Sequence, residues 1–245
     1  MKGSLRVRAV YEGVEVHSDP MEKTGGAPIA LILFGPPGSG KGTQAKLLQS
    51  CLHVPHISTG DMLRGHIQAG DALGREVVAG MQAGMLVPDD FVNGLVETRI
   101  EQPDAKGGFL LDGYPRTLQQ ASVLGNMLKQ RGVVPMVVHL KVDYNKVISR
   151  LSGRRQCPLC GTLYNLSTNP PKCDNLCDLD GTELVTRPDD SEAVIRQRLE
   201  EYESQTKPLL DFFKSSGYPY HEVNGSAGSR ESIAQEICSL VTTKQ

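Results

Sequence analysis

The chain has 245 residues, of which 39% are hydrophobic and 22% are charged, and its formal net charge at pH 7 is −2. This length and apolar content suffice for one large α/β domain, or for a core with insertions. The near-neutral charge lacks the basic surplus of dedicated nucleic-acid binders, so no nucleic-acid partner is expected. Neither a membrane span of roughly 18 apolar residues nor a signal-peptide core is visible, which predicts a soluble, cytoplasmic protein without membrane association.

Residues 1–28 differ from the rest of the chain and are predicted to form an extension and a linker. Apolar and charged residues alternate at 5–8 and 14–16 around Glu12-Gly13, which is typical of a short β-hairpin. A transit peptide is the alternative, but transit peptides are poor in acids, and this segment balances its basic residues with acidic ones. We therefore favour the hairpin over a targeting segment.

The segment that follows carries a glycine-rich loop. An apolar strand at 30–34 leads into Gly-Pro-Pro-Gly-Ser-Gly-Lys-Gly-Thr at 35–43, and a helical pattern continues to 52. The loop glycines let backbone N–H groups converge on an oxyanion, the helix adds its positive end, and Lys41 adds a mobile charge. A nucleoside triphosphate is the expected ligand. Gly42 stands where the strict Walker A pattern has Ser or Thr, and the hydroxyl comes one residue later, at Thr43.

Beyond this loop the chain alternates strands and helices, which predicts a parallel sheet covered on both faces. Further strands are expected at 108–111, 136–142 and 220–223. Helices are expected at 61–70, 73–83, 89–102, 118–131, 144–152, 190–216 and 229–241. A cysteine- and proline-rich stretch at about 154–187 interrupts the alternation and is expected to form a small inserted lobe.

Two more motifs narrow the protein class. Ser-Thr-Gly-Asp-Met-Leu-Arg stands at 58–64, and Gly-Phe-Leu-Leu-Asp-Gly-Tyr-Pro-Arg at 108–116 brings Asp112 to the carboxyl end of a strand, where open α/β sheets bind ligands. Each has a structural explanation when taken alone: Asp61, for example, fits the first turn of a helix capped by Ser58 or Thr59. In this order and spacing, and together with the Gly-Lys-Gly-Thr loop, they resemble the nucleoside monophosphate kinases, the adenylate kinase family above all.

That resemblance implies an α/β P-loop core at 29–245, an acceptor-binding helical flap at 58–87 and a lid at 153–187. It implies a monomer that transfers a phosphoryl group reversibly from MgATP to AMP, giving two ADP. The implied ATP-binding residues are Gly38, Ser39, Gly40, Lys41, Gly42, Thr43, Arg150 and Arg154. The implied AMP-binding residues are Thr59, Arg64, Val87, Gly113, Arg116, Gln120, Arg187 and Arg198.

Phosphoryl transfer needs positioning and charge neutralisation more than a dedicated base, which suits a site rich in arginine. The residues implied to act in the chemistry are Lys41, Asp112, Arg116, Arg150, Arg154, Arg187 and Arg198, with Asp112 holding Mg²⁺ through water. Asp190 is predicted to cap the next helix, whereas Asp189 fits either a cap or a partner of the lid arginines. The alternatives are a kinase with a GTP donor or a pyrimidine acceptor, and a zinc-ribbon module on an inactive nucleotide-binding fold.

The inserted lobe has metal-ligand spacing. Sixteen residues separate Cys157-x2-Cys160 from Cys177-x2-Asp180, and tetrahedral zinc accepts three thiolates and one carboxylate oxygen. The lid of zinc-containing bacterial members of the family is similar, with Cys or Asp as the last ligand. Cys173 offers a four-cysteine alternative to Asp180, and a metal-free lid is a further one. The site would be structural.

The remaining cysteines and histidines are predicted to have no such role. Cys51 and Cys238 lie in amphipathic helical patterns and are expected to be ordinary buried thiols. The histidines at 53, 56, 139 and 221 are expected to be core or surface residues without a ligand.

Overall fold

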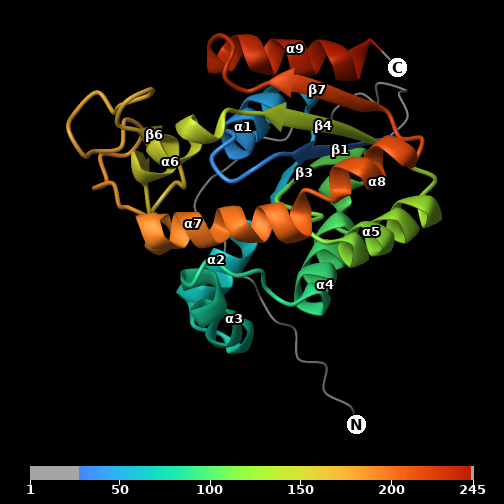
Figure 1. The fold of residues 1–245 in the computed structure, drawn as a ribbon, viewed down its shortest axis with the longest axis horizontal. Coiled ribbons are helices and arrows are strands. Elements are labelled where there is room, and N and C mark those ends of the chain that lie inside the picture. The colour runs from blue at the N-terminus through green and yellow to red at the C-terminus, as the bar shows by residue number, and fades with distance from the viewer. Residues whose placement is uncertain (1–27, 244–245) are drawn as a thin grey trace.

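The computed structural model describes residues 28–243 and has a five-stranded parallel sheet at its centre (Figure 1). The strand order is β2-β3-β1-β4-β7, with β1 paired to both β3 and β4. The strands are β1 Ile29–Phe34, β2 His56–Ser58, β3 Gly108–Asp112, β4 Pro135–Lys141 and β7 Tyr220–Asn224. The parallel sheet confirms the predicted fold class. The hairpin expected near the N-terminus lies outside the described residues.

Four of these strands match the predicted ones within two residues at either end, and β2 was missed. It has three residues, follows a proline and alternates a histidine with an isoleucine, so no apolar run marks it. The strand forms because it pairs in parallel with β3, placing Ser58 opposite Asp112. Tertiary pairing thus decides a strand that local propensity does not indicate.

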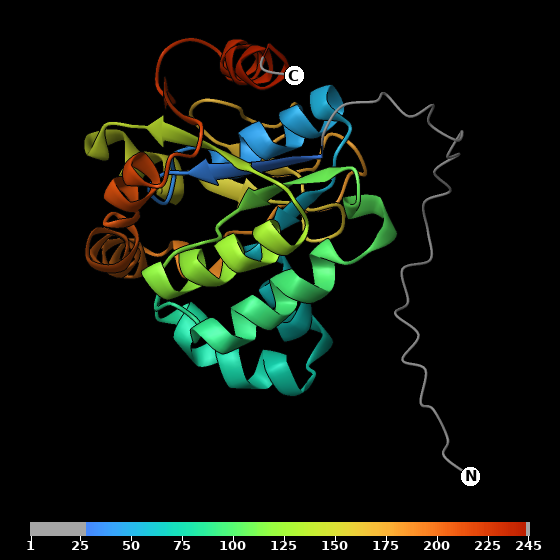
Figure 2. The same ribbon diagram turned by 90° about the vertical axis from the view of Figure 1, so that its right-hand side faces the viewer.

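Helices cover both faces of the sheet (Figure 2). Alternate side chains of β1 point to opposite sides: Ile32 and Phe34 pack into a core with α2, α4, α5 and α8, and Leu31 and Leu33 into a core with α1 and α9. The α-helices are α1 Lys41–Leu52, α2 Thr59–Ala69, α3 Ala72–Gln82, α4 Asp89–Ile100, α5 Leu118–Gln130, α6 Tyr144–Ser152, α7 Glu192–Glu201, α8 Leu209–Ser215 and α9 Arg230–Thr242. A short 3₁₀ turn, Pro103–Ala105, follows α4.

The single helix predicted at 190–216 is wrong. The structure has a 3₁₀ turn Pro188–Asp190, then α7, a π-helical turn Tyr202–Thr206, and α8. Pro208 stands before α8 and has no N–H to donate, while the Lys207 N–H reaches back five residues to the Tyr202 carbonyl at 2.7 Å. The π turn thereby joins two helices that the continuous pattern had suggested were one.

The inserted lobe between α6 and α7 contains a two-stranded antiparallel sheet, β5 Arg154–Gln156 and β6 Leu163–Asn165. Its small buried cluster consists of Cys157, Tyr164, Cys177 and Leu184. None of the helices among residues 28–243 combines the length and the hydropathy required to traverse a bilayer.

A disulfide between Cys51 and Cys238 joins α1 to α9, with 6.5 Å between the two Cα atoms. The expectation that both residues are ordinary buried thiols is wrong: Cys51 is exposed at the end of α1 and Cys238 is half-buried. The helices are far apart in sequence and come together because both pack on the same face of the sheet. Only this packing reveals that the two thiols can meet.

We expect that replacing both cysteines with serine lowers the free energy of unfolding by about 2–4 kcal/mol, because a cross-link over 187 residues restricts the unfolded chain. Urea unfolding of Cys51→Ser/Cys238→Ser against the parent measures this. Cys173→Ser, which removes an exposed free thiol, serves as the control. Equal midpoints for the double variant and the parent would show that the disulfide does not stabilise the fold.

Candidate functional site

A cleft of about 630 Å³ opens at the carboxyl ends of the parallel strands, where the loop at 35–40 leaves β1 and enters α1. Gly35 has φ +149°, and a Cβ at this position would stand 2.7 Å from the Leu140 carbonyl oxygen. Gly40, the residue before α1, is left-handed with φ +97°. Glycine is therefore required at both positions, and the loop carries no bulk that would keep a phosphate from the helix N-terminus.

Lys41 begins α1 and turns back over this loop. Its Nζ donates to the carbonyl oxygens of Gly35 at 2.7 Å and Pro36 at 2.9 Å. Burial, together with neighbouring arginines, lowers its pKa to about 8, and the charge of Asp112 opposes that shift. The ammonium is therefore mostly protonated at neutral pH and is available to a phosphate in the loop.

Asp112 ends β3 beside the loop, and the structure gives it a partner that sequence patterns did not. His56 Nε2 lies 3.4 Å from Asp112 Oδ2, and both side chains are largely buried. Burial raises the pKa of Asp112, but the hydrogen bond with His56 and the charge of Lys41 outweigh it, so the pKa lies below its ordinary value. A buried, ionised carboxylate thus faces the phosphate loop.

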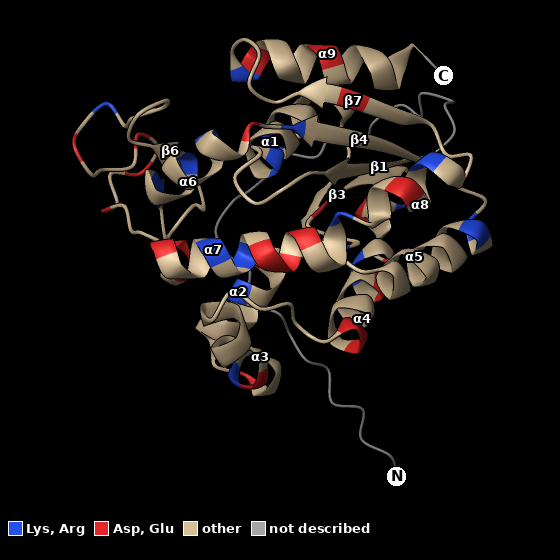
Figure 3. Cartoon of the chain, in the orientation of Figure 1, with Lys and Arg blue, Asp and Glu red and all other residues tan. Residues whose placement is uncertain are grey.

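Two acids after the lobe hold two of the predicted arginines. Arg154 donates from Nε to Asp190 at 2.7 Å, and Arg198 donates to Asp189 at 2.9 Å and to Asp190 at 3.1 Å. The prediction that Asp190 caps the next helix is wrong: its fully buried carboxylate binds these arginines, and the residue before α7, Ser191, makes no side-chain cap. Figure 3 shows that α7, which carries Arg198, bears both signs of charge.

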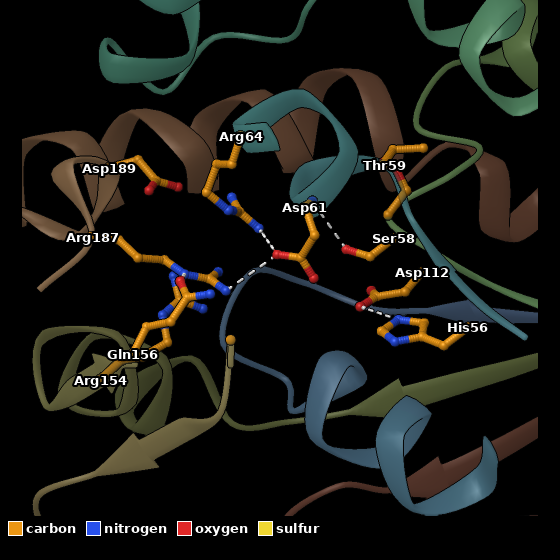
Figure 4. Close-up of polar contacts among 12 residues, drawn as sticks. His56, Ser58, Thr59, Asp61, Arg64, Asp112, Arg154, Gln156, Arg187 and Asp189 are labelled. Atoms are coloured by element: carbon orange, nitrogen blue, oxygen red, sulfur yellow. Dashed lines mark hydrogen bonds and ion pairs between the residues drawn. The ribbon is translucent and has the colours of Figure 1, made fainter. Parts of the chain in front are cut away.

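Asp61 lies between two other predicted arginines (Figure 4). Its carboxylate accepts from Arg64 at 2.5 Å and lies 3.6 Å from Arg187 Nη2, while Ser58 caps the Asp61 N–H at 3.2 Å. Burial raises the pKa of Asp61, but the two guanidinium groups bring it down to about 2. Burial and the like charges of Arg64 and Arg154 lower the pKa of Arg187 to about 9.

A second, smaller cavity adjoins the cleft. Thr59 and Arg116 both donate to the Gly113 carbonyl, at 2.9 and 2.8 Å, which fixes the start of α2 against the loop after β3. The amide of Gln120 is buried, accepts from the Arg116 N–H at 2.7 Å and donates to Asp89 at 2.8 Å. Sequence reasoning had no signal for this role of Asp89, because 31 residues separate it from Gln120.

The predicted residues line the cleft, the smaller cavity or both. The cleft is lined by all the residues assigned to ATP: Gly38, Ser39, Gly40, Lys41, Gly42, Thr43, Arg150 and Arg154. The smaller cavity is lined by Thr59, Arg64, Val87, Gly113, Arg116, Gln120 and Arg198, all assigned to AMP. Arg187 is the exception among those residues, since it lines the cleft. Gly113 and three arginines, Arg64, Arg116 and Arg198, line both the cleft and the smaller cavity.

The cysteine lobe brings together the ligand set that its spacing indicated. One potential ligand atom from each of Cys157, Cys160, Cys177 and Asp180 lies within 4.8 Å of the others, and among the described residues Cys173 is not part of that group. Cys157 and Cys177 are buried, and the Cys160 N–H points to Cys157 Sγ at 3.4 Å. Three sulfurs and a carboxylate at this separation fit the donor preferences of tetrahedral zinc.

Comparison with known proteins agrees with this geometry. The family model "Adenylate kinase" matches residues 33–218. The chain belongs to the adenylate kinase family. Curated relatives named adenylate kinase include those of Anaeromyxobacter sp. (strain K), 48% identical over 76% of this chain and 88% of the relative, and Clostridium perfringens, 41% identical over 87% and 98%. One from Methanothrix thermoacetophila is 44% identical over 88% of this chain and 99% of its own length.

Family membership confirms the predicted enzyme class. The chain is a kinase that binds ATP, AMP and ADP and transfers a phosphoryl group between ATP and AMP. Neither alternative, a nucleoside monophosphate kinase of other specificity or an inactive zinc-ribbon module, is better supported. The cysteine and aspartate group of the lobe is compatible with a metal such as zinc.

Proposed function

We propose that the cleft holds MgATP, that the smaller cavity holds AMP, and that the phosphoryl group passes between them past Arg64, Arg116 and Arg198. The observation that carries this proposal is that these three guanidinium groups line both the cleft and the smaller cavity. Such a position matches the need of phosphoryl transfer, in which negative charge on the transferred group and on both nucleotides must be neutralised together.

The phosphate loop and Lys41 bind the phosphates of ATP, together with Arg150 and Arg154, which line the same cleft. Before ATP binds, the Lys41 Nζ is held by loop carbonyls, so binding exchanges those neutral acceptors for phosphate oxygens. Asp112 is suited to hold Mg²⁺ through water, because the ion prefers oxygen ligands and retains several waters. When bound, the ion neutralises charge on the phosphates.

The acceptor binds in the smaller cavity, which the flap at 58–87 lines on one side. Thr59, Val87 and Gln120 contact the adenine, while Arg64, Arg116 and Arg187 bind the phosphate. The Gln120 amide keeps one donor and one acceptor position after its bonds to Asp89 and Arg116. The edge of adenine presents the complementary donor and acceptor.

Residues 153–187 act as a lid that keeps water from the phosphates. Lys46 on α1 donates to the Gly161 carbonyl at the lobe's first cysteine turn, at 2.7 Å, and gives the lid a contact with the phosphate-loop helix. One zinc ion would be held by Cys157, Cys160, Cys177 and Asp180. It would cross-link the two turns and take no part in the reaction.

The enzyme is proposed to act as a cytoplasmic monomer. A single chain brings together every residue assigned to the transfer, so no second copy is needed to complete the site. Because a disulfide such as Cys51–Cys238 is unusual in a reducing compartment, its state in the cell tests the location. Thiol labelling in freshly lysed cells, together with fractionation, measures that state and the location. Sedimentation of the purified protein measures the oligomeric state.

A panel of donors and acceptors tests the nucleotide assignment. We expect the highest kcat/KM for ATP with AMP, and a value lower by at least about tenfold, equivalent to 1.4 kcal/mol, when CMP or UMP replaces AMP. Gln120→Ala is expected to narrow that difference, because it removes the amide that distinguishes the bases. Preferential use of a pyrimidine acceptor, or of GTP over ATP, would contradict the assignment.

A further inference from the structure

Three arginines near the junction of lid and core are held in two different ways. Arg154 and Arg198 are paired with the buried carboxylates of Asp189 and Asp190. Arg187 is different: its Nε donates to the side-chain oxygen of Gln156 at 2.5 Å, and an uncharged amide therefore takes the place of an acid. Figure 4 shows Gln156 beside Arg187, with Asp61 on the other side of the guanidinium.

The position of Gln156 is well defined by its backbone. It ends β5 opposite Leu163 of β6, and on its other edge its N–H and carbonyl pair with Val185, both at 2.9 Å. Gln156 thus links the strand that enters the lobe to the segment that leaves it, two residues before Arg187. Because β6 and the segment at Val185 pair with the two edges of β5 at Gln156, its backbone is fixed, and the side-chain amide is held in reach of the guanidinium.

The bond to Nε also determines which nitrogens remain for substrate. A guanidinium has one N–H on Nε and four on the two Nη atoms. With Nε occupied, the Nη groups are the ones left for the cleft, and Nη2 lies 3.6 Å from Asp61 Oδ1. Asp61 is half exposed and is shared with Arg64, so a phosphate can replace it. A paired Nη edge binds two phosphate oxygens at once.

We propose that Gln156 is a positioning residue for Arg187: its neutral amide oxygen orients the guanidinium toward the acceptor phosphate without cancelling the charge that binds it. A carboxylate in its place would hold the same nitrogen but would compete with phosphate for the positive charge. The inference rests on the proposed function of Arg187 in binding AMP, and it makes the orientation of that residue depend on the lid strand β5.

Two substitutions separate the contribution of the hydrogen bond from that of the absence of charge on the amide. Gln156→Leu removes the acceptor at similar size, and we expect KM for AMP to rise about tenfold, the range lost when a hydrogen bond to a charged group is removed. Gln156→Glu keeps an acceptor but adds a charge, and we expect KM for AMP to rise at least as much. KM for ATP, metal content and melting temperature should stay at parent values. Gln102→Leu is the matched control, because this glutamine is exposed and lines neither the cleft nor the smaller cavity.

A double-mutant cycle tests whether Gln156 acts through Arg187. In an Arg187→Ala background, Gln156→Leu should have no further effect on KM for AMP or on kcat. The inference is overturned if KM for AMP is unchanged in either single variant, or if the Glu variant is less impaired than the Leu variant. It is also overturned if KM for AMP and KM for ATP rise equally while metal or stability is lost. Full additivity of the two substitutions in the cycle would overturn it as well. If Arg187→Ala itself behaves like the parent, the proposed role of Arg187 fails instead.

Discussion

Arg116→Ala is expected to lower kcat for transfer between ATP and AMP by about 10³–10⁵-fold while the fold remains intact, by analogy with other phosphate-stabilising arginines. Arg116 lines both the cleft and the smaller cavity, and its guanidinium is fixed by the Gly113 carbonyl, so the charge is in place before substrate binds. Lys41→Ala should also lower kcat, because its Nζ is the positive charge held against the phosphate loop.

The measurement is a coupled assay at saturating ATP and AMP, together with the melting temperature of each variant. Arg196→Ala is the control: this arginine is exposed on α7, two residues from Arg198, and pairs with Glu192. Exposed pairs of this kind contribute little, so activity and stability should both be retained. Near-parent turnover in Arg116→Ala would refute the assignment of the transfer site.

Cys157→Ser and Cys177→Ser are each expected to lose the bound metal and to lower the melting temperature, with activity largely kept at moderate temperature. The lobe has a buried cluster of four residues and little other apolar core, so the cross-link replaces packing that the lobe lacks. Structural zinc sites in small peptides bind with roughly 10–16 kcal/mol at pH 7, which indicates how much stability a lost site can remove locally.

Elemental analysis of each variant, with thermal unfolding, makes the comparison. Cys173→Ser is the matched control, because this cysteine is in the same lobe, is exposed and stands outside the four-ligand group. Asp180→Cys should bind metal at least as tightly, since it exchanges a carboxylate for a thiolate. Metal lost in Cys173→Ser but kept in Asp180→Ala would replace the ligand set with four cysteines.

Patterns carried by neighbouring residues were predictable from the sequence. The phosphate loop requires glycines at fixed offsets from one lysine, and each of the two candidate metal-binding turns requires two donors with two residues between them; both conditions are met within a few residues. The apolar runs at β1, β3 and β4 likewise predicted the buried parallel sheet, since strands covered on both faces are apolar along their length.

The tertiary structure decided which distant side chains become partners. His56 meets Asp112 because β2 pairs with β3, and Cys51 meets Cys238 because α1 and α9 share one face of the sheet. The Gln156–Arg187 contact joins the two ends of the lobe in the same way. Helical and strand periods predict which face a residue occupies, but the strand order and helix packing determine what that face meets. Local spacing therefore determined the phosphate loop and the group of potential metal ligands in the lobe, and long-range packing determined the partners that orient the charged groups.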